Sequence, residues 1–299
     1  MKTRTLLFLF LLCSLFAGAQ PLRLAVYQYA DNPRIRNLEP VAAYLGRALG
    51  RETTVRSYPD VHALIRGLQA GEVDLAFIST FGYLLLAGDS LSHPMRPLCA
   101  LAADQPQGQY RTAFVARREV VVSTWPQLGD PGAESLRLAL VASGSTSGNL
   151  VPRLMLGGIG IGKADAHFAS VRYAGTHARA LELLLRDSAD VAAMGSTEWE
   201  RLDKARQDRL RLLALSEDIP LGPALVNQRL PAGLQKKIGR LLMRLPASDP
   251  AAFDALRAAW TESRNATRFD RVTLADYERY LRSFGSKTPL QALLRSLAH

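Results

Sequence analysis

The sequence predicts an α/β protein with mostly parallel sheets, built from two series of alternating strands and helices. Short apolar runs rich in Val, Leu and Ala alternate with segments in which apolar residues recur every three or four positions. This alternation is typical of βαβ units. The series is interrupted once and extended segments return late in the chain, which indicates two lobes, the first completed by C-terminal residues.

The first series begins with an apolar strand, and its first helix has an amphipathic pattern that ends at Gly50. Glycine commonly ends helices because it adopts a left-handed backbone conformation without steric cost. From the same patterns we expect strands at 22–28, 53–57, 73–78 and 112–117, and helices at 38–49, 61–69 and 83–87.

The second series has the same alternation. We expect strands at 136–142, 167–173, 190–194 and 210–215, helices at 148–157, 177–186 and 197–206, and an extended return at 224–228. The tail from 231 onward has a helical pattern, with breaks expected at Pro246, Pro250 and Pro289 because proline lacks the N–H that a helix needs. A ligand would lie between the lobes, at the carboxyl ends of the strands.

Residues 1–19 have the pattern of a secretory signal peptide. A basic start is followed by an apolar run at 6–16 and by Ala17-Gly18-Ala19, a small-residue cleavage pattern. The run is shorter than the about 20 residues of a membrane span. We therefore expect cleavage near Ala19 and a soluble, exported protein, with an uncleaved anchor as the alternative.

The charge balance argues against nucleic acid as a partner. The chain has 37 Lys and Arg against 27 Asp and Glu, a net charge of +10, but the surplus is scattered. No basic tract carries interleaved aromatic residues. An anionic small ligand, or an ordinary solvated surface, explains the charge better.

The cysteines and histidines predict neither a disulfide nor a metal site. Only Cys99 remains once the signal is removed, so no intramolecular disulfide can form. Its apolar context favours a buried hydrophobe, with a thiol ligand for a soft species as the alternative. The five histidines lack metal-ligand spacing, and we expect no metal and no cofactor.

Three hydroxyl residues, Ser145, Thr146 and Ser147, crowd the turn between a predicted strand and a predicted helix. At a helix start the first N–H groups have no partner and the dipole is positive. Hydroxyls added there can surround a tetrahedral oxyanion. Simple capping is the alternative, because Ser and Thr cap many helices.

Several short motifs occur in a fixed order along residues 22–245. The most specific pair is Ser-Thr-Ser-Gly at 145–148 with Val-Pro at 151–152, then Gly-Thr-His at 175–177. The set resembles the periplasmic solute-binding proteins of phosphonate, phosphite and phosphate ABC importers, which have the type II periplasmic binding fold. Weaker matches are an early helix at 37–45, Gly-Glu-Val-Asp-Leu-Ala-Phe at 71–77, Gly-Gln-Tyr-Arg at 108–111, Asp-Val-Ala-Ala at 190–193 and Ile-Pro at 219–220.

The resemblance implies a ligand cleft between a first lobe of residues 20–112 and 217–299 and a second lobe of residues 113–216. His177 would approach the ligand from a helix start, and a protonated ring there would make affinity pH-dependent. A cap or surface role is the alternative for His177, and helix core is the alternative for Tyr83. The ligand contacts that the resemblance implies are Ser145, Thr146, Ser147, His177, Tyr110, Thr80 and Tyr83.

Two positions depart from the family's pattern. Met194-Gly195 stands where many relatives carry an acidic residue, and Val61 replaces a ligand-contacting tyrosine. Without these groups an aminoalkylphosphonate loses its ammonium partner, unless Glu198 supplies one. A small oxyanion that needs only hydroxyl, amide and imidazole donors is the easier ligand.

The resemblance implies a monomeric binding protein, not an enzyme, that captures a phosphonate, phosphite or phosphate-like oxyanion for an ABC permease. The alternative is a sensing protein that partners a two-component sensor kinase and detects an oxyanion or arsenite, with Cys99 involved. A Ser/His hydrolase with Ser145 or Ser147 as nucleophile and His177 as base is least expected. The sequence shows no Gly-x-Ser-x-Gly elbow and no motif for an acidic partner of His177.

Overall fold

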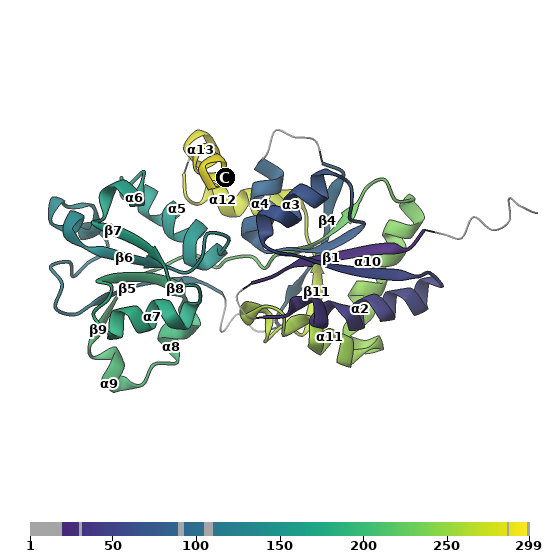
Figure 1. The fold of residues 1–299 in the computed structure, drawn as a ribbon, viewed down its shortest axis with the longest axis horizontal. Helices are drawn as coiled ribbons and strands as arrows, with labels where there is room; N and C mark the ends of the chain where they lie inside the picture. Colours follow the sequence, from purple (N-terminus) through teal and green to yellow (C-terminus); the bar gives the residue numbers. More distant parts are fainter. Residues whose placement is uncertain (1–19, 30–31, 89–92, 105–109, 286, 298–299) are drawn as a thin grey trace, which may run out of the picture.

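The computed structural model describes residues 20–29, 32–88, 93–104, 110–285 and 287–297. Its two mixed sheets lie side by side along the long axis, each with helices on both faces (Figure 1). The two-lobed α/β fold is therefore confirmed. The expected signal peptide at 1–19 lies outside the described residues, and the lobe boundaries at 112 and 217 stay predictions.

The first lobe is built on a six-stranded sheet. Its strands are β1 (Leu22–Tyr27), β2 (Thr53–Tyr58), β3 (Leu75–Phe77), β4 (Met95–Ala102), β10 (Pro223–Asn227) and β11 (Arg268–Arg271). They lie in the order β11-β4-β10-β3-β1-β2. Strand β1 is parallel to β2 and β3, whereas β10 is antiparallel to both β3 and β4. The late strand β10 thus returns the chain to the centre of the first sheet, as the sequence predicts.

Helices cover both faces of this first sheet. On one face lie α2 (Arg34–Leu49), α10 (Ala232–Ser248) and α11 (Pro250–Arg257), and on the other lie α3 (Val61–Gln69) and α4 (Thr80–Gly88). The strands send alternate side chains into the two apolar clusters, so Leu24 and Val26 join one and Ala25 joins the other. The first lobe is therefore a three-layer α/β/α unit.

The second lobe has a five-stranded sheet of order β7-β6-β8-β5-β9. Strand β6 is parallel to β7 and β8, and β5 is antiparallel to β8 and β9. The strands are β5 (Thr112–Arg117), β6 (Arg137–Leu140), β7 (Ser170–Tyr173), β8 (Val191–Gly195) and β9 (Leu210–Leu215). The main helical segments are η4 (Thr146–Leu150), α5 (Val151–Gly158), α6 (Ala164–His167), α7 (His177–Leu185), α8 (Ser196–Glu200) and α9 (Lys204–Gln207).

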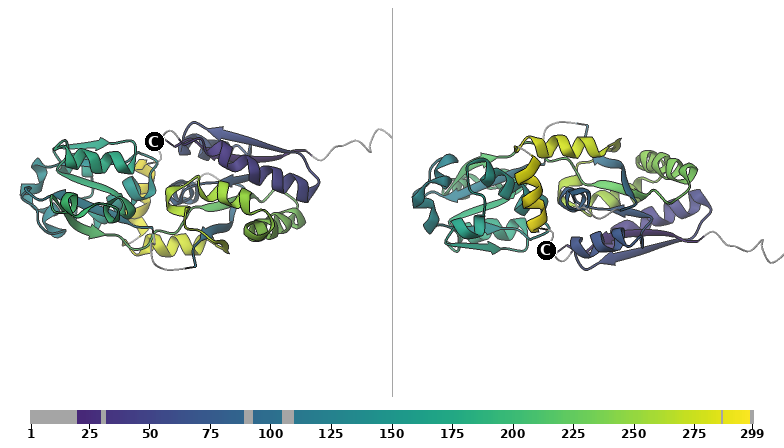
Figure 2. Two further views of the ribbon diagram at one scale, coloured as in Figure 1. Left: turned by 90° about the horizontal axis from the view of Figure 1, so that it is seen from below. Right: turned by 90° about the horizontal axis from the view of Figure 1, so that it is seen from above.

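Two C-terminal helices, α12 (Leu274–Arg282) and α13 (Lys287–Leu297), lie beside the junction of the two lobes (Figures 1 and 2). Tyr277 of α12 is fully buried against the first lobe, and its hydroxyl donates to the carbonyl of Leu221 at 2.8 Å. Tyr280, one turn on, packs in a cluster with Val151 of α5. Helix α12 therefore contacts both lobes.

The structure differs from the sequence-based expectation at several elements. Helix α2 begins at Arg34, one turn before the expected 38, and strands β4 and β11 were not expected. Pro246 does not break α10, because it lies in the last turn, where one lost N–H leaves the earlier hydrogen bonds intact. The expected helix at 197–206 is two short helices, and the expected strand at 167–173 is strand only from Ser170.

The fold directs strand ends and helix starts toward the junction. Strands β1 and β3 of the first lobe and β6 of the second end just before the segments that line one small cavity. Helices α2 and α7 begin at residues that line the same cavity. Helix starts carry unpaired N–H groups and a positive dipole end, so the junction favours an anion before any side chain is considered.

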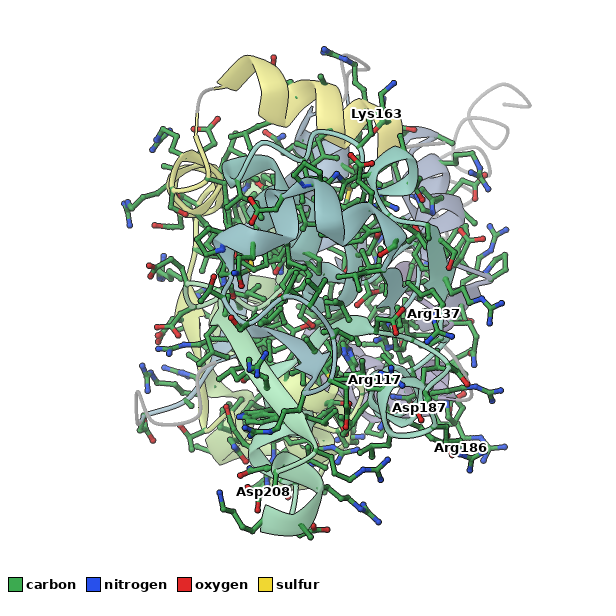
Figure 3. All side chains as sticks on the ribbon, turned by 90° about the vertical axis from the view of Figure 1, so that its left-hand side faces the viewer. Arg117, Arg137, Lys163, Arg186, Asp187 and Asp208 are labelled. Carbon is green, nitrogen blue, oxygen red and sulfur yellow. The ribbon has the colours of Figure 1, made fainter. Side chains whose placement is uncertain are left out.

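Charged side chains are spread over the outer surface. At the far end of the second lobe, Arg117 pairs with Asp187 and Arg137 pairs with Asp190 (Figure 3). Neighbouring acids thus offset part of the positive charge. Across the described ranges, no helix combines the length and the apolar character needed to cross a bilayer.

Candidate anion-binding site

A small cavity lies where the two lobes meet. Its volume is about 40 Å³. Because a single water needs about 10–15 Å³ on this measure, the cavity has room for a few waters or one compact anion. Its wall includes Tyr29, Arg34, Ser79, Trp260 and Glu262 of the first lobe, Ser145, Thr146 and His177 of the second, and Tyr110 from the connection.

The hydroxyls of Ser145 and Thr146 are oriented by backbone N–H groups. Ser145 Oγ accepts from the N–H of Gly148 at 3.1 Å, and Thr146 Oγ1 accepts from the N–H of Phe81 at 3.0 Å. A hydroxyl whose oxygen accepts one bond still has its own proton to donate. Both side chains line the cavity, so their protons are available to an acceptor inside it.

Ser147 has a different place from its two neighbours. It is fully buried, and its Oγ shares a hydrogen bond of 2.5 Å with Oη of Tyr110. Its carbonyl accepts from Thr112 Oγ1 at 2.8 Å. Ser147 does not line the cavity, whereas Tyr110 does. Ser147 therefore holds Tyr110 in position rather than facing the cavity itself.

His177 begins α7 and lies on the cavity wall as a neutral ring. Its Nδ1 accepts from the N–H of Gly195 at 2.9 Å, so this nitrogen carries no proton. Burial lowers the pKa of His177 to about 4. Without an anion the ring is therefore neutral, because partial burial disfavours its charged form and Nδ1 already accepts a backbone N–H, and protonation of His177 by a bound anion stays a prediction. The remaining Nε2–H is a neutral donor.

Thr80 and Tyr83 do not line the cavity. Thr80 Oγ1 donates to the carbonyl of Pro220 and thereby ties the start of α4 to the return segment. The ring of Tyr83 packs edge-on against Tyr277, with 4.8 Å between the centroids. Helix α4 begins at Thr80, so Tyr83 lies one turn on, in the core. Ser79, just before α4, faces the cavity instead.

Arg34, the most deeply buried charge on the cavity wall, was not expected from the sequence. The residue is only 4% exposed, and its Nε donates to the carbonyl of Ala259 at 3.0 Å. Arg34 is the first residue of α2, which has no acidic residue in its first turn. A cation at a helix start opposes the dipole and needs a reason. Because the helix was expected to begin at 38, Arg34 lay outside it, and the unusual cation at a helix start could not be seen in the sequence.

Three residues of the cavity wall each carry a buried donor that has no partner among the described residues. Seven buried side-chain N or O atoms lack a hydrogen bond within the described part of the chain, and three of these are Tyr29 Oη, Arg34 Nη1 and Trp260 Nε1. Burial raises the pKa of Tyr29 to about 12, so its hydroxyl keeps its proton. Unpaired buried donors are costly unless something accepts from them. The cavity is suited to a ligand rich in acceptors.

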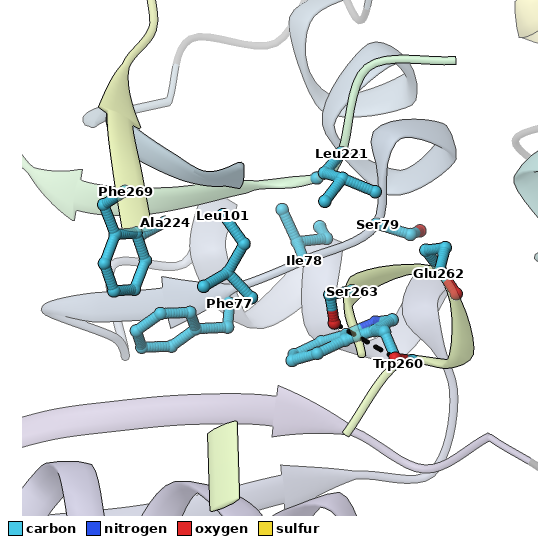
Figure 4. Close-up of a pocket in the computed structure, with 11 residues that line it drawn as sticks. Phe77, Ile78, Ser79, Leu101, Leu221, Ala224, Trp260, Glu262, Ser263 and Phe269 are labelled. Carbon is cyan, nitrogen blue, oxygen red and sulfur yellow. Dashed lines mark hydrogen bonds between the residues drawn. The ribbon is translucent and has the colours of Figure 1, made fainter. Parts of the chain in front are cut away.

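A second cavity lies behind Trp260, with a volume of about 20 Å³ (Figure 4). Phe77, Ile78, Leu101 and Phe269 make most of its wall apolar. Ser79, Trp260 and Ser263 add a few donors, but the mostly apolar wall compensates an oxyanion poorly for lost water, so this cavity suits an anion less well than the first.

The acids and the thiol named from the sequence lie elsewhere. Glu198 is in α8 and does not line the cavity. Among the described residues on the cavity wall, Glu262 is the only one with a carboxylate. Burial raises the pKa of Glu262. Cys99, in β4, is 1% exposed within the first core, and burial raises the pKa of its thiol to about 12. Among the residues the structure describes, no His, Cys, Asp and Glu group could hold a metal ion.

Comparison with known proteins gives a family match and a set of similar folds. Residues 25–277 match the family described as the periplasmic substrate-binding protein of phosphonate ABC transporters. XAC2383 from Xanthomonas citri, solved with chloride and with ATP, has a TM-score of 0.70 and 21% identity over 93% of this chain and 98–99% of its own.

Two further solved structures are similar. PhnD1 from Prochlorococcus marinus, in complex with methylphosphonate, has a TM-score of 0.66 and 16% identity over 88% of this chain and 98% of its own. A binding protein component of an ABC phosphonate transporter from Pseudomonas aeruginosa has a TM-score of 0.64 and 17% identity over 93% and 95%. At these identities the likeness shows the fold, which is that of type II periplasmic binding proteins.

Proposed function

This chain belongs to the family of periplasmic substrate-binding proteins of phosphonate ABC transporters, and we propose that its cavity captures one small phosphorus oxyanion for delivery to an ABC permease. The observation that carries the proposal is that three residues of the wall between the lobes, Tyr29, Arg34 and Trp260, each carry a buried donor without a partner in the part of the chain that the structure describes. A tetrahedral oxyanion presents acceptors in every direction and can satisfy them all.

The size of the cavity supports a compact ligand. A volume of about 40 Å³ suits phosphite, phosphate or methylphosphonate, the ligand of the similar PhnD1. ATP, found with the similar XAC2383, is far larger than this space. We therefore place the substrate among phosphorus oxyanions with no substituent or a very short one.

Second-lobe donors complete the proposed site. The O–H groups of Ser145 and Thr146 and the Nε2–H of His177 face the anion from one side, and Tyr110 lies between the lobes. Hydrogen bonds to a charged group are worth about 1.5–3 kcal/mol each. These donors are held in place before the ligand arrives, which reduces the cost of ordering them on binding.

We also propose that the chain acts without catalysis, as a monomer, after removal of residues 1–19 in the periplasm. A serine hydrolase needs a base whose second nitrogen is oriented by an acid. In this chain Nδ1 of His177 accepts from a backbone N–H instead. The arsenite-sensing alternative has no support from Cys99, which is buried in the first core and outside the cavity wall.

Calorimetry tests the proposal directly. We expect purified mature protein to bind at least one of methylphosphonate, phosphite and phosphate at one site per chain, and ATP not at all. No release of phosphate or alcohol from phosphate esters is expected. Absence of heat with all three anions, in protein with a cooperative thermal transition, would contradict the function.

A further inference from the structure

Three aromatic rings surround the guanidinium of Arg34. Its Cζ lies 4.5 Å from the ring centroid of Tyr27, 5.0 Å from that of Tyr29 and 4.7 Å from that of Trp260. Rings at this distance attract a cation through their negative faces. Sites of this kind usually receive an ammonium group from a ligand. Here the compartment already holds a cation from the protein's own chain.

Within the described ranges, no salt bridge offsets the charge of Arg34, although that charge is near enough to Glu262 to oppose the rise that burial causes in the pKa of its carboxyl. None of the ion pairs among the described residues involves Arg34, although Glu262 lines the same cavity. Its Nε is used by Ala259, and its buried Nη1 has no partner. A buried charge without a partner is expensive, and the start of α2 adds a positive dipole end at the same place. An anion in the cavity removes both costs.

We propose that Arg34 sets the substrate class of this protein: it supplies the positive charge that the anion needs and, by filling the aromatic compartment, excludes phosphonates that carry an ammonium group. This rests on the proposed function. A ligand such as 2-aminoethylphosphonate would bring its ammonium beside a buried guanidinium, where low dielectric makes repulsion strong. Methylphosphonate and phosphite bring no second charge.

The proposal predicts a reversal of preference. Removal of the Arg34 side chain would leave Tyr27, Tyr29 and Trp260 as an empty aromatic compartment, with Glu262 on the same wall. These groups suit an ammonium. Propylphosphonate has the same length as 2-aminoethylphosphonate without the charge, so a comparison of the two separates charge from size.

The experiment is calorimetry with methylphosphonate, 2-aminoethylphosphonate and propylphosphonate on the wild type, Arg34→Ala and Arg34→Gln. In the wild type we expect 2-aminoethylphosphonate to bind no better than propylphosphonate. Both variants should lose about 10–100-fold in affinity for methylphosphonate, the effect of a charged hydrogen bond. In Arg34→Ala, 2-aminoethylphosphonate should exceed propylphosphonate by about 5-fold or more, as expected for a cation over aromatic rings.

Arg56→Ala is the matched control, because Arg56 also lies over a tyrosine ring, at 4.3 Å from that of Tyr58, but is exposed and outside the cavity. Its affinities should equal those of the wild type. If Arg34→Ala fails to fold, Arg34→Lys decides: with the charge kept, it should still bind methylphosphonate better than Arg34→Gln and still discriminate against 2-aminoethylphosphonate.

Distinct outcomes contradict the inference and the function. Wild type that binds 2-aminoethylphosphonate more tightly than methylphosphonate overturns the role of Arg34 and leaves the oxyanion function standing. The same holds if Arg34→Gln binds methylphosphonate as the wild type does. Wild type that binds none of the three phosphonates, nor phosphite or phosphate, overturns the proposed function itself.

Discussion

At the residue scale, the site depends on hydroxyls whose oxygens are already engaged. Ser145 and Thr146 each accept a backbone N–H, which fixes the oxygen and leaves the proton for the ligand. The same geometry gives these side chains a structural role beside the binding role that we propose for them. Substitutions at the two positions should therefore affect stability and affinity to different extents.

We predict that Thr146→Val weakens oxyanion binding by about 10–100-fold, the loss of one hydrogen bond to a charged group. It also leaves the N–H of Phe81 without its acceptor, at a cost of about 1–3 kcal/mol if the group stays buried. Thr146→Ser keeps the hydroxyl and is the control. Calorimetry and thermal melting measure the two effects. Equal affinity of the Val and Ser variants would remove Thr146 from the site.

We predict that His177 makes folding, not binding, sensitive to acid. Burial lowers its pKa to about 4, below the ordinary 6.5, so the unfolded chain binds one more proton between these values. The stability contributed by the neutral ring is complete above pH 6.5 and is lost as the pH falls through 4. Melting temperature against pH should fall less steeply in His177→Gln than in the wild type over this window.

The affinity for the oxyanion should not depend on the protonation of the His177 ring. For an anion of constant charge, affinity should be flat between pH 6 and 8, because His177 is neutral throughout that range. A rise in affinity as the pH falls from 7 to 6, lost in His177→Gln, would show that the ligand does protonate the ring.

From the sequence, residues at a helix start could be predicted to bind an anion. Their protonation states and their contacts with distant residues could not be predicted. The sequence names Ser145, Thr146 and His177 as candidates, and all three line the cavity. It cannot show that Gly195 donates to His177, because eighteen positions and two elements separate them. Arg34 and Trp260 meet across even more of the chain, so no local pattern indicates their contact.

At the element scale, the oxyanion turn is a single π-helical turn, η4, rather than the start of a regular helix. The N–H of Leu150 donates to the carbonyl of Ser145, and the N–H of Val141 donates to the carbonyl of Gly148. The wide turn shifts the hydroxyls relative to α5 that follows. π-turns inside helices occur often at functional sites. The sequence predicts helix here and cannot distinguish the two hydrogen-bond patterns.

We predict that Gly148→Ala disrupts this turn. A Cβ at Gly148 would lie 2.2 Å from Cγ2 and 2.3 Å from Cβ of Val141, so the turn or the strand end must move. Overpacking of this kind costs about 1–3 kcal/mol, and a displaced turn should lose oxyanion affinity. Gly157→Ala in α5 is the control, because no atom lies within 4 Å of its Cβ and alanine favours a helix. Thermal melting and calorimetry compare the two, and equal behaviour would contradict the prediction.

A strong periodic pattern of apolar residues predicted the bounds of a helix where the same residues also form its packed face. Helix α3 matches the expected 61–69 because its apolar positions fall on one face. Strand β4 was missed because Arg96 and Pro97 interrupt its apolar residues, and β11, Arg-Phe-Asp-Arg, has a single apolar side chain. Both strands lie at one side of the first sheet, where only tertiary pairing stabilises them.

At the scale of the whole molecule, the two lobes meet around the cavity and along α12. The Phe81–Thr146 hydrogen bond joins the lobes beside the ligand position. Tyr280 joins them at a distance from it, through Val151 of α5 and Ile219 of the return segment. No sequence pattern indicates that a C-terminal helix would contact both lobes, because the residues concerned are far apart along the chain.

We predict that Tyr280→Ala weakens oxyanion binding although Tyr280 does not line the cavity. Contacts made only when the lobes meet contribute to affinity, because a ligand bound by both lobes is linked to their association. Loss of a buried aromatic side chain costs about 3–5 kcal/mol in a core. Tyr277, bound to Leu221, should still hold α12 on the first lobe. We expect a loss of affinity of about 10-fold. This loss corresponds to about 1.4 kcal/mol, the part of the lost packing energy that would stabilise the closed arrangement of the two lobes.

Tyr280→Phe is the control for this prediction, because the hydroxyl of Tyr280 is buried without a hydrogen-bond partner in the described residues. Removal of that unsatisfied group should leave affinity unchanged or slightly higher. Calorimetry gives the affinities, and small-angle scattering of the ligand-free protein should show a larger radius of gyration for Tyr280→Ala than for Tyr280→Phe. If Tyr280→Ala binds as tightly as Tyr280→Phe, α12 supports the first lobe alone, and closure around the anion depends on the contacts beside the cavity.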